Sequence, residues 1–139
     1  MKKYDREVFE KLARVIRSDD SESEKWLVDN DCRELKEFWD ACEGVEKSFR
    51  WLLDNNYRQL AATVDALNGN DQAKAFLLQS GNRELAAFVE ACGGSQQAVN
   101  WLIKGGYPGW IIAAKEVHLK QKKKEKSFWS IFNLGNPFS

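Results

Sequence analysis

Residues 47–69, KSFRWLLDNNYRQLAATVDALNG, form the unit from which most of this chain is built. An aromatic ring followed by two aliphatic residues recurs every 25 residues, in the tetrads KWLV, RWLL, AFLL and NWLI, at Trp26, Trp51, Phe76 and Trp101. Nine positions after each ring comes a second recurring residue: Leu35, Leu60, Leu85 and Trp110. No gap is needed between Lys25 and Val117, so the chain is a tandem array, a pattern typical of proteins whose units bury their apolar faces against neighbours.

Apolar spacing within each unit predicts two short helices, of about 9 and 11 residues. The ring and its aliphatic neighbours give the first helix a wide apolar arc. The second helix carries apolar residues at i, i+3, i+4 and i+7, as in Leu35, Phe38, Trp39 and Cys42. The first helix is expected to end at residue pairs that tolerate positive φ: Asn30-Asp31, Asn55-Asn56, Ser80-Gly81 and Gly105-Gly106. Gly44, Gly69 and Gly94 are expected to end the second helix, with Asp71 and Ser95 as N-caps of the next.

The predicted fold is therefore all-α: an α-solenoid of about four helix-turn-helix repeats over residues 21–119. It resembles short-unit α-solenoids in general, and the resemblance implies no active residues. Residues 1–20 are expected to hold an N-terminal capping helix, which a polar linker over residues 18–24 joins to the repeats. The last helix is expected to run to about Lys124, and residues 120–139 form a C-terminal extension. The end of the last repeat is expected to expose Trp110, Ile111 and Ile112.

Composition indicates one folded domain with an uneven charge. The chain has 139 residues and is 43% hydrophobic. Residues 1–114 carry 15 Lys/Arg against 19 Asp/Glu, a net charge of −4, and residues 115–139 carry 6 against 2, a net charge of +4. Three cysteines without metal-ligand spacing suit a reducing compartment. No apolar run of secretory or membrane-spanning type is evident, so we expect a cytoplasmic protein.

Catalytic and metal chemistry have little support in the sequence. His118 is the one histidine, lies among lysines, and is expected to be an exposed structural residue. The Gly-Gly pairs are turns and do not form a phosphate loop. We therefore expect no metal, no cofactor and no enzymatic activity.

Arg33, Arg58 and Arg83 recur with the 25-residue period and are candidate binding residues. Equivalent positions stack in a solenoid, so the arginines could form a strip that binds phosphate or carboxylate groups of a partner. Alternatively, they pair within the array with a second recurring row, Asp40, Asp65 and Glu90, which lies two helical turns further on. Charges of alternating sign make nucleic acid an unlikely partner.

Tyr57 and Tyr107 are further candidate contact residues. They share a repeat position with Cys32 and Asn82, and a position that tolerates Asn is expected to face solvent at least in part. Packing of both rings against the adjacent turn is the alternative.

The C-terminal tail is the feature that the period leaves unexplained. Its basic residues include Lys122, Lys123 and Lys124, and its aromatic residues include Phe128, Trp129 and Phe132. A basic segment beside an aromatic one suits an interfacial membrane anchor or a peptide that docks in a partner's groove. A third alternative is that the tail folds back over the open end of the last repeat.

The function predicted from these patterns is a non-enzymatic scaffold for protein–protein interaction. Its partner would be another protein or peptide, bound through a concave groove or through the turns that carry the Asn and Gly pairs. The alternative function is a peripheral membrane adaptor, in which the tail binds an anionic membrane surface.

Overall fold

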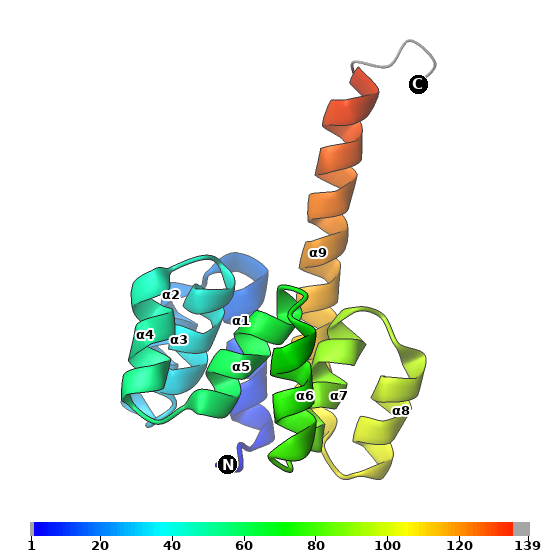
Figure 1. The fold of residues 1–139 in the computed structure, drawn as a ribbon. Coiled ribbons are helices and arrows are strands. Elements are labelled where there is room, and N and C mark those ends of the chain that lie inside the picture. The colour runs from blue at the N-terminus through cyan, green and yellow to red at the C-terminus, as the bar shows by residue number, and fades with distance from the viewer. Residues whose placement is uncertain (1, 135–139) are drawn as a thin grey trace.

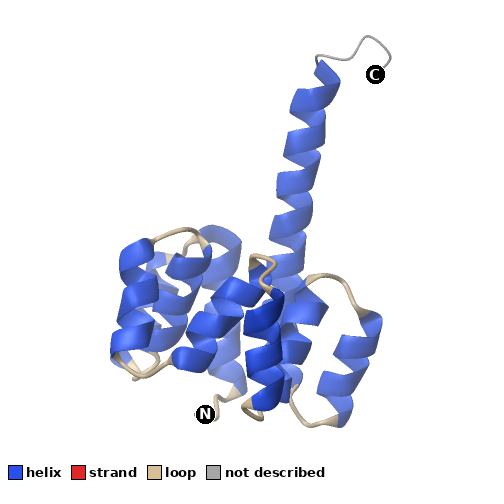
Figure 2. Ribbon diagram, viewed as in Figure 1, coloured by secondary structure: helices blue, strands red, loops and turns tan. Residues whose placement is uncertain are grey.

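The computed structural model describes the backbone of residues 2–134 and the side chains of residues 2–123. In this range the chain forms nine helices and no strand, which confirms the all-α prediction (Figure 2). The helices labelled in Figure 1 are α1 (Arg6–Ser18), α2 (Ser21–Asp29), α3 (Arg33–Cys42), α4 (Glu46–Asp54), α5 (Arg58–Leu67), α6 (Asp71–Gln79), α7 (Arg83–Cys92), α8 (Gln96–Lys104) and α9 (Pro108–Leu134).

The 25-residue period appears in the structure as an alternation of helix lengths. Helices α2, α4, α6 and α8 each contain nine residues, and we call them the outer helices. Helices α3, α5 and α7 each contain ten residues, close to the predicted eleven. Together with α1 and α9 they form the inner helices. Helices α3 and α5 each pack most extensively against the outer helix that follows, and α7 packs equally against α8 and α9.

The predicted turn from outer to inner helix is confirmed in all four units. One residue in each turn has positive φ: Asp31 (61°), Asn56 (66°), Gly81 (81°) and Gly106 (82°). In the second unit the amide of Tyr57 then donates to the carbonyl of Leu52 at 2.7 Å. Left-handed backbone costs most residues free energy, and Gly, Asn and Asp tolerate it best. The need for positive φ explains why only Asp, Asn and Gly occur at this repeat position.

The turn from inner to outer helix uses glycine at Gly44, Gly69 and Gly94, with φ between 94° and 95°. Ser95 is an N-cap as predicted, because its hydroxyl accepts from the amide of Ala98 at 3.2 Å. The Asp71 prediction is wrong by one residue, since the side chain of Asn70 accepts from Ala73 and Asp71 is already helical. The predicted linker is also shorter, because α2 begins at Ser21.

The inner helices surround a single core. They contact one another in the order α1, α3, α5, α7 and α9, and α9 then packs against α1, so the series closes on itself. The outer helices lie around the outside of this group (Figure 1).

Four aromatic side chains fill the centre between the inner helices. The rings of Phe9 and Trp110 are 4.9 Å apart, those of Trp110 and Phe88 are 5.0 Å apart, and those of Phe88 and Phe38 are 6.2 Å apart. All four side chains are buried. Packed core therefore occupies the inner side of the repeats, where a concave groove was predicted.

Helix α1 covers the end of the last repeat. Trp110 is buried and Ile111 and Ile112 are half-buried, so the expected open end is wrong. Two polar contacts fasten the same interface: Arg17 pairs with Glu116 at 2.8 Å, and the Lys120 ammonium donates to the Ile16 carbonyl at 2.8 Å. The predicted capping helix thus packs against both the first repeat and the last.

Helix α9 runs to Leu134, ten residues beyond the predicted end at Lys124. Figure 1 shows its C-terminal part extending beyond the other helices. In the part of the chain that the structure describes, no helix combines the length and apolar character needed to cross a bilayer.

Candidate interaction surface

Each outer helix buries one aliphatic residue and exposes the next. Leu27, Leu52, Leu77 and Leu102 are fully buried. Their neighbours Val28, Leu53, Leu78 and Ile103 are between 44% and 58% exposed. Successive residues of a helix point about 100° apart, so one faces the inner helices while the next faces solvent.

The recurring rings extend this exposed apolar surface. Phe76 is 41% and Trp101 is 40% exposed, whereas Trp26 and Trp51 are half-buried. We call the set the outer apolar row, which consists of Trp26, Val28, Trp51, Leu53, Phe76, Leu78, Trp101 and Ile103. These residues recur at the same two positions of successive outer helices, which lie around the outside of the inner helices (Figure 1).

The three arginines predicted as binding residues each occupy the first position of an inner helix, and all are exposed: Arg33 in α3, Arg58 in α5 and Arg83 in α7. The guanidinium of Arg33 lies over the ring of Trp51, 4.7 Å from its centroid. This cation–π contact joins one repeat to the next.

The predicted tyrosines both stack on a recurring tryptophan. Tyr57 lies 5.8 Å from Trp51 with the rings 10° apart, and Tyr107 lies 5.9 Å from Trp101 with the rings 4° apart. Each ring thus packs on the outer helix that precedes its turn. Tyr57 remains half-buried and Tyr107 exposed, so each also presents an edge to solvent.

The interpretation that the arginine row pairs with the acidic row is wrong for the residues whose partners are seen. Arg33 approaches Glu37 at 3.8 Å. Asp40 instead pairs with Lys36 at 2.9 Å, and Glu90 pairs with Lys74. Lysines one helical turn away or on the neighbouring outer helix reach these carboxylates, which the period alone did not indicate.

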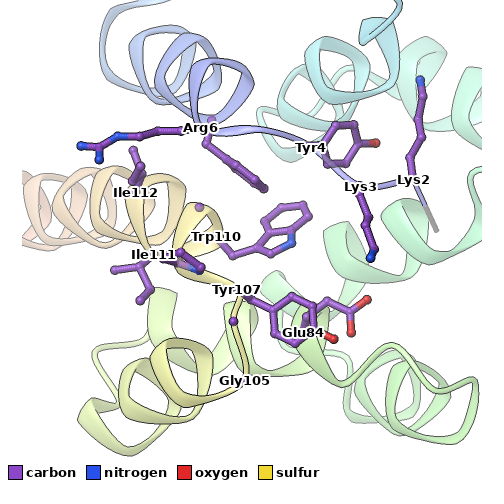
Figure 3. Close-up of a pocket in the computed structure, with 14 residues that line it drawn as sticks. Lys2, Lys3, Tyr4, Arg6, Glu84, Gly105, Tyr107, Trp110, Ile111 and Ile112 are labelled. Atoms are coloured by element: carbon purple, nitrogen blue, oxygen red, sulfur yellow. The ribbon is translucent and has the colours of Figure 1, made fainter.

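A pocket of about 760 Å³ lies where the N-terminal segment meets the start of α9 (Figure 3). Basic and aromatic side chains shape it, including Lys3, Arg6, Tyr107 and Trp110, and Glu84 contributes a carboxylate. The residues that line it include no Cys, His or Ser. The nucleophilic groups that line it are therefore limited to the amines of Lys2 and Lys3, the phenols of Tyr4 and Tyr107 and the carboxylate of Glu84.

One buried carboxylate beside this pocket was missed by the sequence analysis. Glu34 is only 2% exposed and accepts hydrogen bonds from Lys2 at 2.8 Å and from the Tyr4 hydroxyl at 2.7 Å. Burial, followed by the bond to Glu34, raises the pKa of Tyr4 far above its usual value. The available signal was the repeat position itself, which holds Glu34, Gln59, Glu84 and Gly109 directly after the arginine row. These bonds tie the N-terminal segment to α3.

The cysteines and the histidine occupy structural positions. Burial raises the pKa of the Cys32 and Cys92 thiols, which lowers their nucleophilicity at neutral pH. His118 is half-buried rather than exposed, with Nδ1 placed 2.9 Å from the Cys92 carbonyl at the end of α7. Among the residues that the structure describes, no group of three or more His, Cys, Asp or Glu side chains is arranged to hold a metal ion.

The tail residues are described only in part. Lys122 and Lys123 are exposed on α9. The side chains of Lys124, Phe128, Trp129 and Phe132 lie outside the described residues, so the membrane anchor and the docking peptide stay predictions. The fold-back over the last repeat is not seen up to Leu134, because α1 covers that end and α9 extends away from it (Figure 1).

Comparison with known proteins adds no family to this description, because no protein-family model, curated protein or solved structure matches the chain.

Proposed function

We propose that this chain is a non-enzymatic protein-binding scaffold. In this proposal the four 25-residue repeats form a short α-solenoid whose two ends meet, and the outer apolar row contacts the partner. The observation that carries the proposal is the recurrence of exposed aliphatic residues at one position of every outer helix: Val28, Leu53, Leu78 and Ile103.

The composition of the core supports the proposal that this row contacts a partner. Trp26 and Trp51 pack in part against the core, but the other members of the row do not belong to it, so most of the row is not needed to complete the core. Complete burial of a fully exposed aliphatic side chain contributes roughly 1.5–3 kcal/mol, and these side chains, between 44% and 58% exposed, would contribute about half of that each. Several such residues spaced over neighbouring helices therefore suit a protein partner better than a small molecule.

The test is affinity capture from native lysate with the full chain and with a doubly substituted variant, Leu78→Asp and Ile103→Asp. Charging two exposed positions of the row should abolish retention of partners that the wild-type chain holds, because the carboxylates would lose hydration on binding. A matched control carries Gln79→Asp and Asn100→Asp, at exposed polar positions of the same helices.

Loss of captured proteins in the row variant but not in the control is the expected result. Equal retention by all three chains would count against the row as the contact surface. Unfolding curves of the three chains should coincide, which separates lost binding from lost folding.

The membrane-adaptor alternative stays a prediction. It depends on aromatic side chains in residues 128–132, which lie outside the described side chains. The described residues offer it the two exposed lysines on α9, Lys122 and Lys123.

A further inference from the structure

Each pair of neighbouring outer helices flanks an inner helix, and the middle pair, α4 and α6, leaves an open groove over α5. This groove has a volume of about 350 Å³. Its walls include apolar side chains, Phe49 and Leu53 on α4 and Phe76 on α6, together with the polar Asn70 and Gln72. Its floor includes Ala61 and Ala62. We call it the middle groove.

The corresponding surfaces in the other repeats differ from the middle groove in their charged side chains. Over α3, Lys36 and Glu37 stand where the middle groove has Ala61 and Ala62, and Lys36 pairs with Glu37 at 3.3 Å. In α7 the equivalent residues are again alanines, Ala86 and Ala87. There, however, Lys74 of α6 forms an ion pair with Glu90 of α7. In α4 the residue equivalent to Lys74 is Phe49, which cannot make that pair.

Two opposite charges therefore remain available at the ends of the middle groove. Asp65 is the counterpart of Asp40 and Glu90, yet neither Asp65 nor Arg58 takes part in an ion pair among the described residues. Both side chains line the groove. They are seven residues apart on α5, so they are separated by about 10 Å along the helix axis.

We propose that the middle groove binds an amphipathic helical segment of a partner protein. The segment carries an acidic residue that meets Arg58, a basic residue two turns away that meets Asp65, and a bulky apolar residue between them that packs on Ala61 and Ala62. Charge complementarity at both ends fixes the direction of the segment. This inference rests on the proposed function, and it specifies the partner's chemistry.

The test begins with selection of helical peptides from a random 14-residue display library on the immobilised full chain. Enriched peptides should contain an acidic and a basic residue at i and i+7, with apolar residues at i+3 or i+4. Affinity of a synthetic copy is then measured by fluorescence anisotropy. Arg58→Glu should weaken binding by at least about tenfold, and replacing the peptide's acidic residue by lysine should restore it. The matched control is Arg83→Glu, at the equivalent position of α7.

A second variant tests the shape of the groove. Phe49→Lys copies the arrangement of Lys74 and Glu90, so the new lysine should pair with Asp65 and reduce peptide affinity by a similar factor. Val99→Lys, at the equivalent half-buried position of α8, should leave affinity unchanged.

Two outcomes would overturn the inference. Peptides that tolerate both Arg58→Glu and Phe49→Lys bind elsewhere, which removes the middle groove while leaving the scaffold function intact. Displacement of the selected peptide by a synthetic peptide of residues 120–139 would mean that this chain supplies its own occupant. Failure of the lysate experiment with the outer-row variant, by contrast, would contradict the scaffold function without bearing on peptide affinity.

Discussion

Gly109 determines how closely α1 and α9 approach each other. A Cβ atom at this position would lie 2.1 Å from Cδ2 of Phe9. Real carbon atoms do not approach so closely, and the contacting atom belongs to a buried ring that is itself packed against Trp110 at 4.9 Å. Glycine is therefore required here for space rather than for an unusual backbone angle.

Gly109→Ala should lower the free energy of unfolding by about 1–3 kcal/mol, the usual cost of overpacking a core. The measurement is urea unfolding followed by circular dichroism. In a Phe9→Leu background the cost of Gly109→Ala should fall, because the smaller side chain leaves room for the methyl group.

Gly93→Ala provides the control for this change. Gly93 has ordinary helical dihedral angles, and its nearest neighbour to an added Cβ is the Glu90 carbonyl at 3.4 Å. Its substitution should change stability by less than about 0.5 kcal/mol. An equal loss at both positions would argue against the close α1–α9 approach.

At the scale of the helices and turns, local chemistry made much of the structure predictable. The Asn and Gly pairs mark the ends of the outer helices because a left-handed residue is needed there, and Asn56 with Gly81 illustrates two answers to that need. The Asp71 prediction failed because Asn70, one residue earlier, offers an equally good capping side chain. Which of two adjacent capping residues accepts the amide depends on where the helix begins, and the residue types alone do not determine that position.

Gly81 allows a test of this turn. Gly81→Ala should lower the free energy of unfolding by about 1 kcal/mol, because the Cβ atom of alanine is strained at positive φ. Gly81→Asn should cost clearly less, since Asn56 occupies the same position of the second repeat at φ 66°. The midpoint of urea unfolding reports both changes. If alanine were tolerated as well as asparagine, the left-handed turn would not be a determinant of the repeat.

At the scale of the whole molecule, the closure of the inner helices was not predictable. The period relates each repeat to the next, but the contact between Phe9 and Trp110 joins residues far apart in the sequence and outside that pattern. One local sign was available: Gly109 replaces the Glu34, Gln59 and Glu84 of the other repeats. The outer apolar row could be read in part from the tetrads, whereas the middle groove depends on which lysines reach which carboxylates in three dimensions.

The most direct test of this account is the nuclear Overhauser effect between the Phe9 ring protons and the α protons of Gly109. Closure of α1 on α9 predicts strong cross-peaks, together with upfield-shifted Gly109 α protons because the aromatic ring lies against them. Cross-peaks from Phe9 to Trp110 should accompany them. Absence of both sets of cross-peaks in the folded chain, with Gly109 α protons at ordinary shifts, would show that the array is open and would contradict the account.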